Sequence, residues 1–208
     1  MSRTAGIPRS LRCWFAFLAD AKGLAAIELA LILPIALMLM SLVVFGGQAY
    51  SVQRKVTMAA TTVSNIFAQA NNVNTSTITA AELNQILAYP NLILYPYDGS
   101  TAAVVVSQLQ VTVNGNGTAT GTICGSWANA NGTARTKGSQ ISVDPSISSA
   151  FSSPGANSNC DHTNLNYVVL GEVSYPLHAT GIYFSVGTIT LHDSIIMIPR
   201  VASPITVQ

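Results

Sequence analysis

One apolar run near the start of the chain constrains the fold most. Residues 24–47 read LAAIELALILPIALMLMSLVVFGG, with a single charged residue, Glu28, and a single proline, Pro34. As an α-helix this run would be about 36 Å long, whereas the hydrocarbon core of a bilayer is about 30 Å thick. The run therefore predicts a transmembrane helix, and Pro34 is expected to kink it.

The charges on either side of the run predict its orientation. Four basic residues precede it and two follow it: Arg3, Arg9, Arg12 and Lys22, then Arg54 and Lys55. By the positive-inside rule the N-terminus is cytoplasmic, and residues beyond about 48 lie across the membrane. For a single-pass protein of a bacterial inner membrane, that side is the periplasm.

A cleaved signal peptide has a similar N-terminal pattern and is the alternative to an anchor. Gly47-Gln48-Ala49 could serve as its cleavage site, which would leave Tyr50 at the new terminus. The run is about twice as long as a usual signal-peptide core and carries a carboxylate near its start. These two features favour the anchor.

The three cysteines lie on opposite sides of the apolar run. Cys13 precedes it, while Cys124 and Cys160 follow it. If the C-terminal part is periplasmic, Cys124 and Cys160 can form a disulfide while Cys13 stays reduced. Two buried free thiols are the alternative.

The pattern beyond the run predicts an α+β fold. Helical spacing continues from residue 48 to about residue 70, and Thr79 with Glu82 has the form of a capping box that opens a short helix ending near Tyr89-Pro90. Strand patterns follow in four segments, residues 103–113, 118–124, 166–177 and 187–198, with a hairpin turn at 114–117. We expect a mainly antiparallel sheet.

The organisation predicted from these patterns has four parts. They are a basic leader (1–23), a transmembrane helix (24–47), a periplasmic extension of that helix (48–70) and an α+β domain (71–208). Residues 125–164 are rich in Ser, Asn, Gly and Pro and lack periodicity, so we interpret them as a surface excursion closed by the cysteine pair. Arg135 and Lys137 are expected to be solvated there.

The start of the apolar run resembles the processing site of type IV prepilins. A basic leader ends at Gly23, and the run then carries Glu28 as its fifth residue from Leu24. The resemblance implies that an aspartyl prepilin peptidase cleaves between Gly23 and Leu24. It also implies that Glu28 pairs with the new N-terminal ammonium of a neighbouring subunit.

The fuller string from Gly23 to Pro34 is similar to the TadE-like (TadE/TadG) family of the tight-adherence, or Flp, pilus system. This resemblance implies a pilin-like, non-catalytic minor pilin or pseudopilin with a long N-terminal helix. The implied partners are inner-membrane lipid, other pilin or Tad assembly proteins and a prepilin peptidase. The alternative function is an adhesin-like surface binding domain, either anchored or released by ordinary signal cleavage; a third is an anchored periplasmic hydrolase.

Other functional classes find little support in the sequence. Charged residues make up 8% of the chain, and no basic stripe indicates a nucleic-acid partner. The three histidines, His162, His178 and His192, lack paired-ligand spacing, so no metal site is expected. No catalytic constellation can be selected, and we expect neither an enzyme nor a cofactor or small-molecule substrate.

Overall fold

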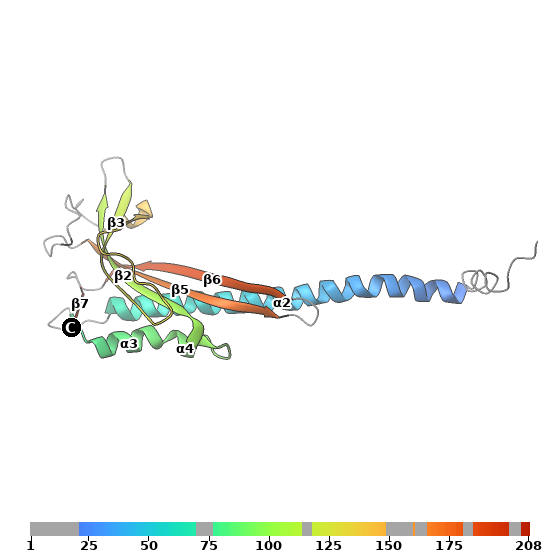
Figure 1. Cartoon of the computed structure of the whole chain (residues 1–208). Coiled ribbons are helices and arrows are strands. Elements are labelled where there is room, and N and C mark those ends of the chain that lie inside the picture. The colour runs from blue at the N-terminus through green and yellow to red at the C-terminus, as the bar shows by residue number, and fades with distance from the viewer. Residues whose placement is uncertain are drawn as a thin grey trace, which may run out of the picture. The chain divides into compact units, whose positions relative to one another are not determined.

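The computed structural model describes residues 21–69, 77–113, 118–148, 160, 166–180, 185–199 and 205–208. The chain divides into two compact units, one comprising residues 1–48 and 181–184 and the other comprising residues 49–180 and 185–208. We call the second unit the sheet domain. The predicted fold class, a long apolar N-terminal helix followed by an antiparallel sheet with one short helix, is confirmed (Figure 1).

Helix α2 runs from Ala21 to Gln69, a length of 49 residues that includes Pro34. Its second half, from Ala49, belongs to the sheet domain and buries one face. The buried side chains follow helical spacing and are Val52, Val56, Ala59, Ala60, Val63 and Phe67. This is the pattern that the sequence predicted for the helix beyond residue 48.

Two short helices follow. α3 (Ala80–Ala88) begins at Thr79, whose side chain accepts from the Glu82 backbone N–H while the Glu82 carboxylate accepts from the Thr79 backbone N–H, so the predicted capping box is confirmed. The Glu82 carboxylate accepts hydrogen bonds from the backbone N–H and from the hydroxyl of Thr79, and these, the backbone one above all, lower the pKa of Glu82. α4 (Pro90–Ile93), which the sequence did not predict, starts after a break at Tyr89 because proline suits the first position of a helix.

Five strands form the main sheet in the order β4-β3-β2-β5-β6, all antiparallel. The strands are β2 (Ala103–Val113), β3 (Ala119–Ala128), β4 (Gln140–Val143), β5 (Tyr167–Thr180) and β6 (Ser185–Met197). A second, two-stranded sheet pairs β1 (Thr77–Ile78) with β7 (Thr206–Val207) in parallel. A 3₁₀ turn, η1 (Gly99–Thr101), precedes β2, and α5 (Pro145–Ser148) follows β4. The predicted hairpin turn at 114–117 lies outside the described residues.

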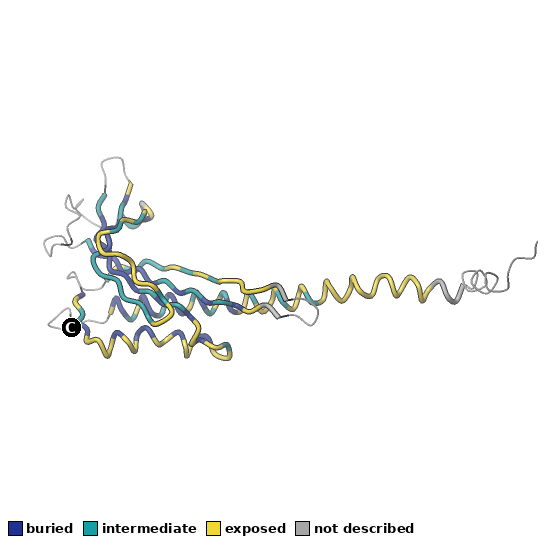
Figure 2. The backbone as a smooth tube through the Cα atoms, in the orientation of Figure 1, coloured by how far each residue is buried: buried dark blue, intermediate teal, exposed yellow. Residues whose placement is uncertain are grey.

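The two faces of the main sheet bury different clusters. On one face, alternate residues of β2 and β5 such as Val104, Val106 and Val173 share a core with the second half of α2. On the other face, Leu109, Val168 and their neighbours form a smaller cluster with Val143 of β4. Dark blue in Figure 2 marks these buried residues along the strands and along α2 within the sheet domain.

The backbone of β5 lies very close to α2, and this contact fixes the helix against the sheet. Gly171 on β5 faces Ser64 and Ala60, and a Cβ at position 171 would overlap the Ser64 hydroxyl. Ser64 is fully buried, and its hydroxyl donates to the carbonyl of Ala60 at 2.7 Å and to that of Ile195 at 3.5 Å. Glycine is needed here because no larger residue leaves room for the helix.

The interpretation of residues 125–164 as a surface excursion was wrong for its first part. β3 continues through Ala128, and Gln140–Val143 pairs with β3 as an edge strand. Trp127 packs its ring 5.5 Å from that of Phe67 on α2, a long-range contact that makes this polar stretch a strand. Gly138, with φ at +84°, turns the chain back toward β4.

Candidate functional site

The first half of α2 exposes an apolar surface with one charged residue, Glu28. From Ala25 to Met40 every residue is exposed, and large side chains such as Leu31 (67%) and Met40 (67%) have most of their surface uncovered. Within the described residues, this helix is long and apolar enough to cross a membrane. Exposing this many apolar side chains to water is energetically unfavourable, whereas the hydrocarbon core of a bilayer accommodates such a helix.

All four sequence-predicted residues of the N-terminal site lie on this one helix. Gly23 and Leu24 fall in its first turn, and Glu28 and Pro34 follow along it. The first four backbone N–H groups of a helix have no partner within the helix, so the first turn unwinds more readily than the rest. Glu28 is exposed on the helix surface, one turn before Leu31 and Ile32.

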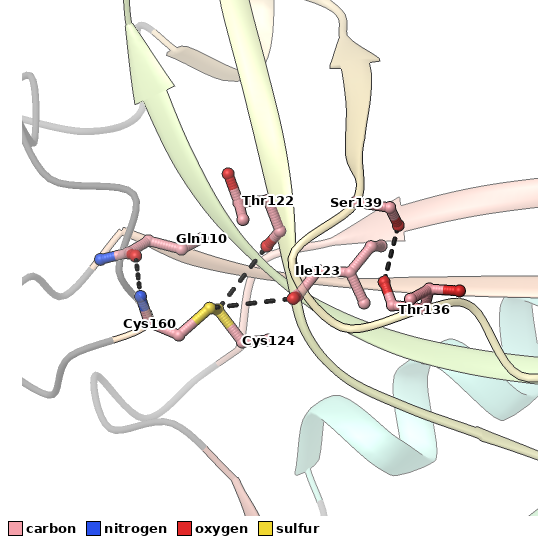
Figure 3. Close-up of a disulfide and its surroundings, with 7 residues drawn as sticks. All are labelled: Gln110, Thr122, Ile123, Cys124, Thr136, Ser139 and Cys160. Carbon is pink, nitrogen blue, oxygen red and sulfur yellow. Dashed lines mark hydrogen bonds between the residues drawn. A yellow bond between two sulfur atoms is a disulfide. The ribbon is translucent and has the colours of Figure 1, made fainter.

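The cysteines that the sequence singled out are bonded to each other. Cys124 on β3 and Cys160 form a disulfide with an S–S distance of 1.98 Å and a Cα–Cα distance of 5.4 Å (Figure 3). The backbone N–H of Cys160 donates to Oε1 of the buried Gln110 on β2 at 2.8 Å. The disulfide and this hydrogen bond attach residue 160 to the middle of the sheet.

An open polar groove that the sequence did not indicate lies on the sheet domain. Its volume is about 580 Å³, and it is lined by residues of β2, β5 and β6 together with residues 131–139. Arg135 donates from Nε and Nη2 to the two carboxylate oxygens of Glu172, both at 2.7 Å. The hydrogen bond to Glu172 raises the pKa of Arg135.

Arg135 and Lys137 are exposed to solvent, as the sequence predicts, and the ion pair of Arg135 with Glu172 is a contact that the sequence did not indicate. The two residues are 37 positions apart in sequence, Arg135 in the segment between β3 and β4 and Glu172 on β5. On the same groove, Ser174 Oγ lies 2.8 Å from His192 Nδ1, because these residues are directly opposite each other on β5 and β6. Neither pair can be predicted from the sequence without knowing which residues lie opposite each other on neighbouring strands.

Metal-ligating side chains do not cluster in the part of the chain that the structure describes. No three His, Cys, Asp or Glu residues within that part come together. His178 contacts Thr188, and Asp193 accepts a hydrogen bond from Thr57 on α2. These polar residues have structural partners within the sheet domain.

Residues 23–64 match the family model of TadE-like proteins, so the predicted resemblance is confirmed over this segment, which begins at Gly23 and includes Glu28 and Pro34. The match indicates a Tad pilus-associated component and a structural rather than enzymatic family. No curated protein and no solved structure matches the chain.

Proposed function

We propose that the protein is a membrane-anchored minor pilin or pseudopilin of a tight-adherence pilus, with a structural role in assembly. The observation that carries the proposal is the match of residues 23–64 to TadE-like proteins, on the helix whose first half exposes a largely apolar surface. The first half of α2 is the inner-membrane anchor. The sheet domain is periplasmic, where the Cys124–Cys160 disulfide is stable.

Glu28 is proposed as the charge that aligns neighbouring subunits. A carboxylate in a membrane-spanning segment costs about 3 kcal/mol, less near the interface, and such residues are usually retained for a role. Its partner is the new ammonium group of Leu24 on an adjacent subunit, released by a prepilin peptidase. Support for the cleavage site comes from the position of Gly23 in the first turn of α2, which unwinds easily.

Substitution of Glu28 tests this role directly. We expect Glu28→Gln, which keeps the shape and removes the charge, to leave membrane insertion unchanged and to reduce piliation by about tenfold or more, since a paired charge in lipid is worth over 1.4 kcal/mol. Piliation is counted by electron microscopy and insertion is measured by carbonate extraction. Ser41→Ala on the same helix is the matched control, because Ser41 only donates to the carbonyl of Leu37.

Cleavage is tested separately by N-terminal sequencing of the membrane-extracted protein. Leu24 as the first residue supports peptidase processing, and Tyr50 supports the secreted, adhesin-like alternative. Full piliation by the Glu28→Gln variant would refute charge pairing even if Leu24 is the mature terminus.

A further inference from the structure

Strand β6 forms one edge of the main sheet. Among the described strands it pairs with β5 alone. β2 begins opposite Ser174 of β5, whereas β6 continues to pair with β5 as far as Gly187, so β5 and β6 extend together beyond β2 (Figure 1). Residues 187–190 are all exposed. The first half of β6 is therefore an uncovered sheet edge.

The hydrogen bonds of the sheet show which backbone groups of β6 face outward. The N–H of Val111 donates to the carbonyl of Asn166 at 2.8 Å, so the even-numbered residues of β5 bond to β2 and the odd-numbered ones bond to β6, since bonding alternates along an antiparallel strand. Leu177 lies opposite Ile189, so the odd-numbered residues of β6 bond to β5. The N–H and C=O groups of the even-numbered residues, such as Thr190, point away from the sheet.

The second half of this edge is partly protected, whereas the first half is open. The carbonyl of His192 accepts from Nε2 of Gln53 at 3.4 Å, and the N–H of Ser194 donates to Oδ1 of Asp193 at 2.8 Å. In residues 188–191 the outward backbone groups make no hydrogen bond within the part of the chain that the structure describes. This segment also contains no lysine, proline or bulge, the features with which proteins block edge pairing.

The side chains of the open segment form one apolar and one polar face. Ile189 and Leu191 lie opposite Leu177 and Tyr175, which are buried in the core shared with α2, yet Ile189 is 40% exposed. Thr190 lies on the other face, because side chains alternate along a strand. A further strand beside β6 would cover Ile189 and continue both faces.

We propose that residues 188–192 of β6 bind an extended segment of another protein, which joins the sheet as an added strand. Only an extended backbone offers alternating N–H and C=O groups at the spacing of a sheet edge. To match the two faces, the segment alternates apolar side chains, next to Ile189 and Leu191, with polar ones. About five residues are enough, which is the usual length of a strand.

A second copy of the chain fits this edge less well. In the sheet domain α2 and β6 run in the same direction, since Gln53 contacts His192 and Ser64 contacts Ile195. Two β6 strands in antiparallel pairing, the more stable arrangement, would turn the two α2 helices in opposite directions. Chains held in one membrane have α2 in a single direction, so this step alone rests on the membrane anchoring proposed above.

Amide hydrogen exchange of the full chain in detergent micelles, resolved by NMR, tests the open edge. In the free protein we expect the amide of Thr190 to exchange at least about tenfold faster than that of Ile189, which is bonded to β5. The probe is a synthetic peptide of alternating threonine and valine with lysine at both ends, at about 1 mM, where weak association is populated. It should slow exchange at Thr190 at least about tenfold. The control peptide, methylated on every backbone nitrogen, should not.

Two substitutions at one position sharpen the test. Thr190→Pro removes the outward N–H and leaves the bonds to β5 in place, just as Pro176 is accommodated on β5 because its nitrogen faces away from β6. Thr190→Val keeps the N–H and is the matched control. Protection of Thr188 by the peptide should persist in Thr190→Val and be lost in Thr190→Pro. Equal protection in the two variants would overturn the proposal.

Three further results would also overturn it. They are exchange at Thr190 as slow as at Ile189 in the free monomer, no protection of Thr190 by the peptide, and protection that increases with protein concentration without peptide, which would assign the edge to a second copy. Exchange at β6 reports on the sheet domain alone. The proposal can therefore fail while the membrane anchor, which carbonate extraction tests, still stands.

Discussion

The two halves of helix α2 are equally helical, yet they bury their side chains differently. From Ala25 to Met40 the apolar surface is exposed all around the helix. From Ala49 to Gln69 most apolar residues lie on one face, which is buried in the core of the sheet domain, while Tyr50 and Met58 are exposed. The pattern of apolar residues accounts for the difference: the half that is apolar on nearly every side could span a membrane, and the half with one apolar face packs against a protein core.

The largest expected effect comes from placing a charged residue in either half of α2 and comparing the two variants. Val63→Asp puts a carboxylate into the fully buried core, and we expect it to cost more than about 4 kcal/mol and to unfold the sheet domain. Val43→Asp should leave the melting of the sheet domain unchanged and weaken membrane insertion by about 3 kcal/mol. Near-UV circular dichroism in detergent measures the first effect, and a translocation assay measures the second. If the sheet domain melted at the same temperature in both variants, the proposed difference between the two halves of α2 would be contradicted.

The next effect tests whether the disulfide stabilises only the sheet domain. The chain-entropy model assigns about 3 to 4 kcal/mol to closing a loop of 36 residues, so Cys124→Ala with Cys160→Ala should lower the free energy of unfolding by that amount. Urea titration of the domain measures this loss. Membrane association of the variant should match that of the unmodified protein, and a simultaneous loss of both properties would contradict independent stabilisation of the two regions.

The smallest effect probes the contact that holds the second half of α2 to the sheet. Gly171→Ala places a methyl group onto the Ser64 hydroxyl and should cost about 2 kcal/mol, typical of overpacking. Adding Ser64→Ala to this variant should recover part of the loss, because the overlapping hydroxyl is removed. Gly47→Ala in the first unit is the control, since nothing lies within 4 Å of its added methyl group. If the double variant is no more stable than Gly171→Ala, the overlap with the Ser64 hydroxyl is not the cause of the lost stability.

Features encoded by neighbouring residues were predictable from the sequence. The Thr79–Glu82 capping box set the start of α3, and the alternation in residues 103–113 gave the bounds of β2. The apolar run and its Glu28 also identified the family segment. Each of these signals lies within one continuous segment of chain, at most the 24 residues of the apolar run.

Features that depend on which strands pair with each other were not predictable. β4 has four residues and forms only because β3 lies beside it, and the two-residue strands β1 and β7 pair across more than half of the chain. The polar groove was not predictable for the same reason. The contact between Arg135 and Glu172 in it requires β5 to lie beside β2. Local propensity carries no information on such pairings.

The core of the sheet domain joins Val52, just after the apolar run, to Ile205, near the last residue of the chain. During synthesis the apolar run leaves the ribosome about 150 residues before Ile205, whereas the core closes only when both ends are available. On the membrane anchoring proposed above, the helix can therefore insert into lipid before the domain folds. For that interval the face of α2 that is later buried, from Val52 to Phe67, is an uncovered apolar stripe and a natural target for a chaperone.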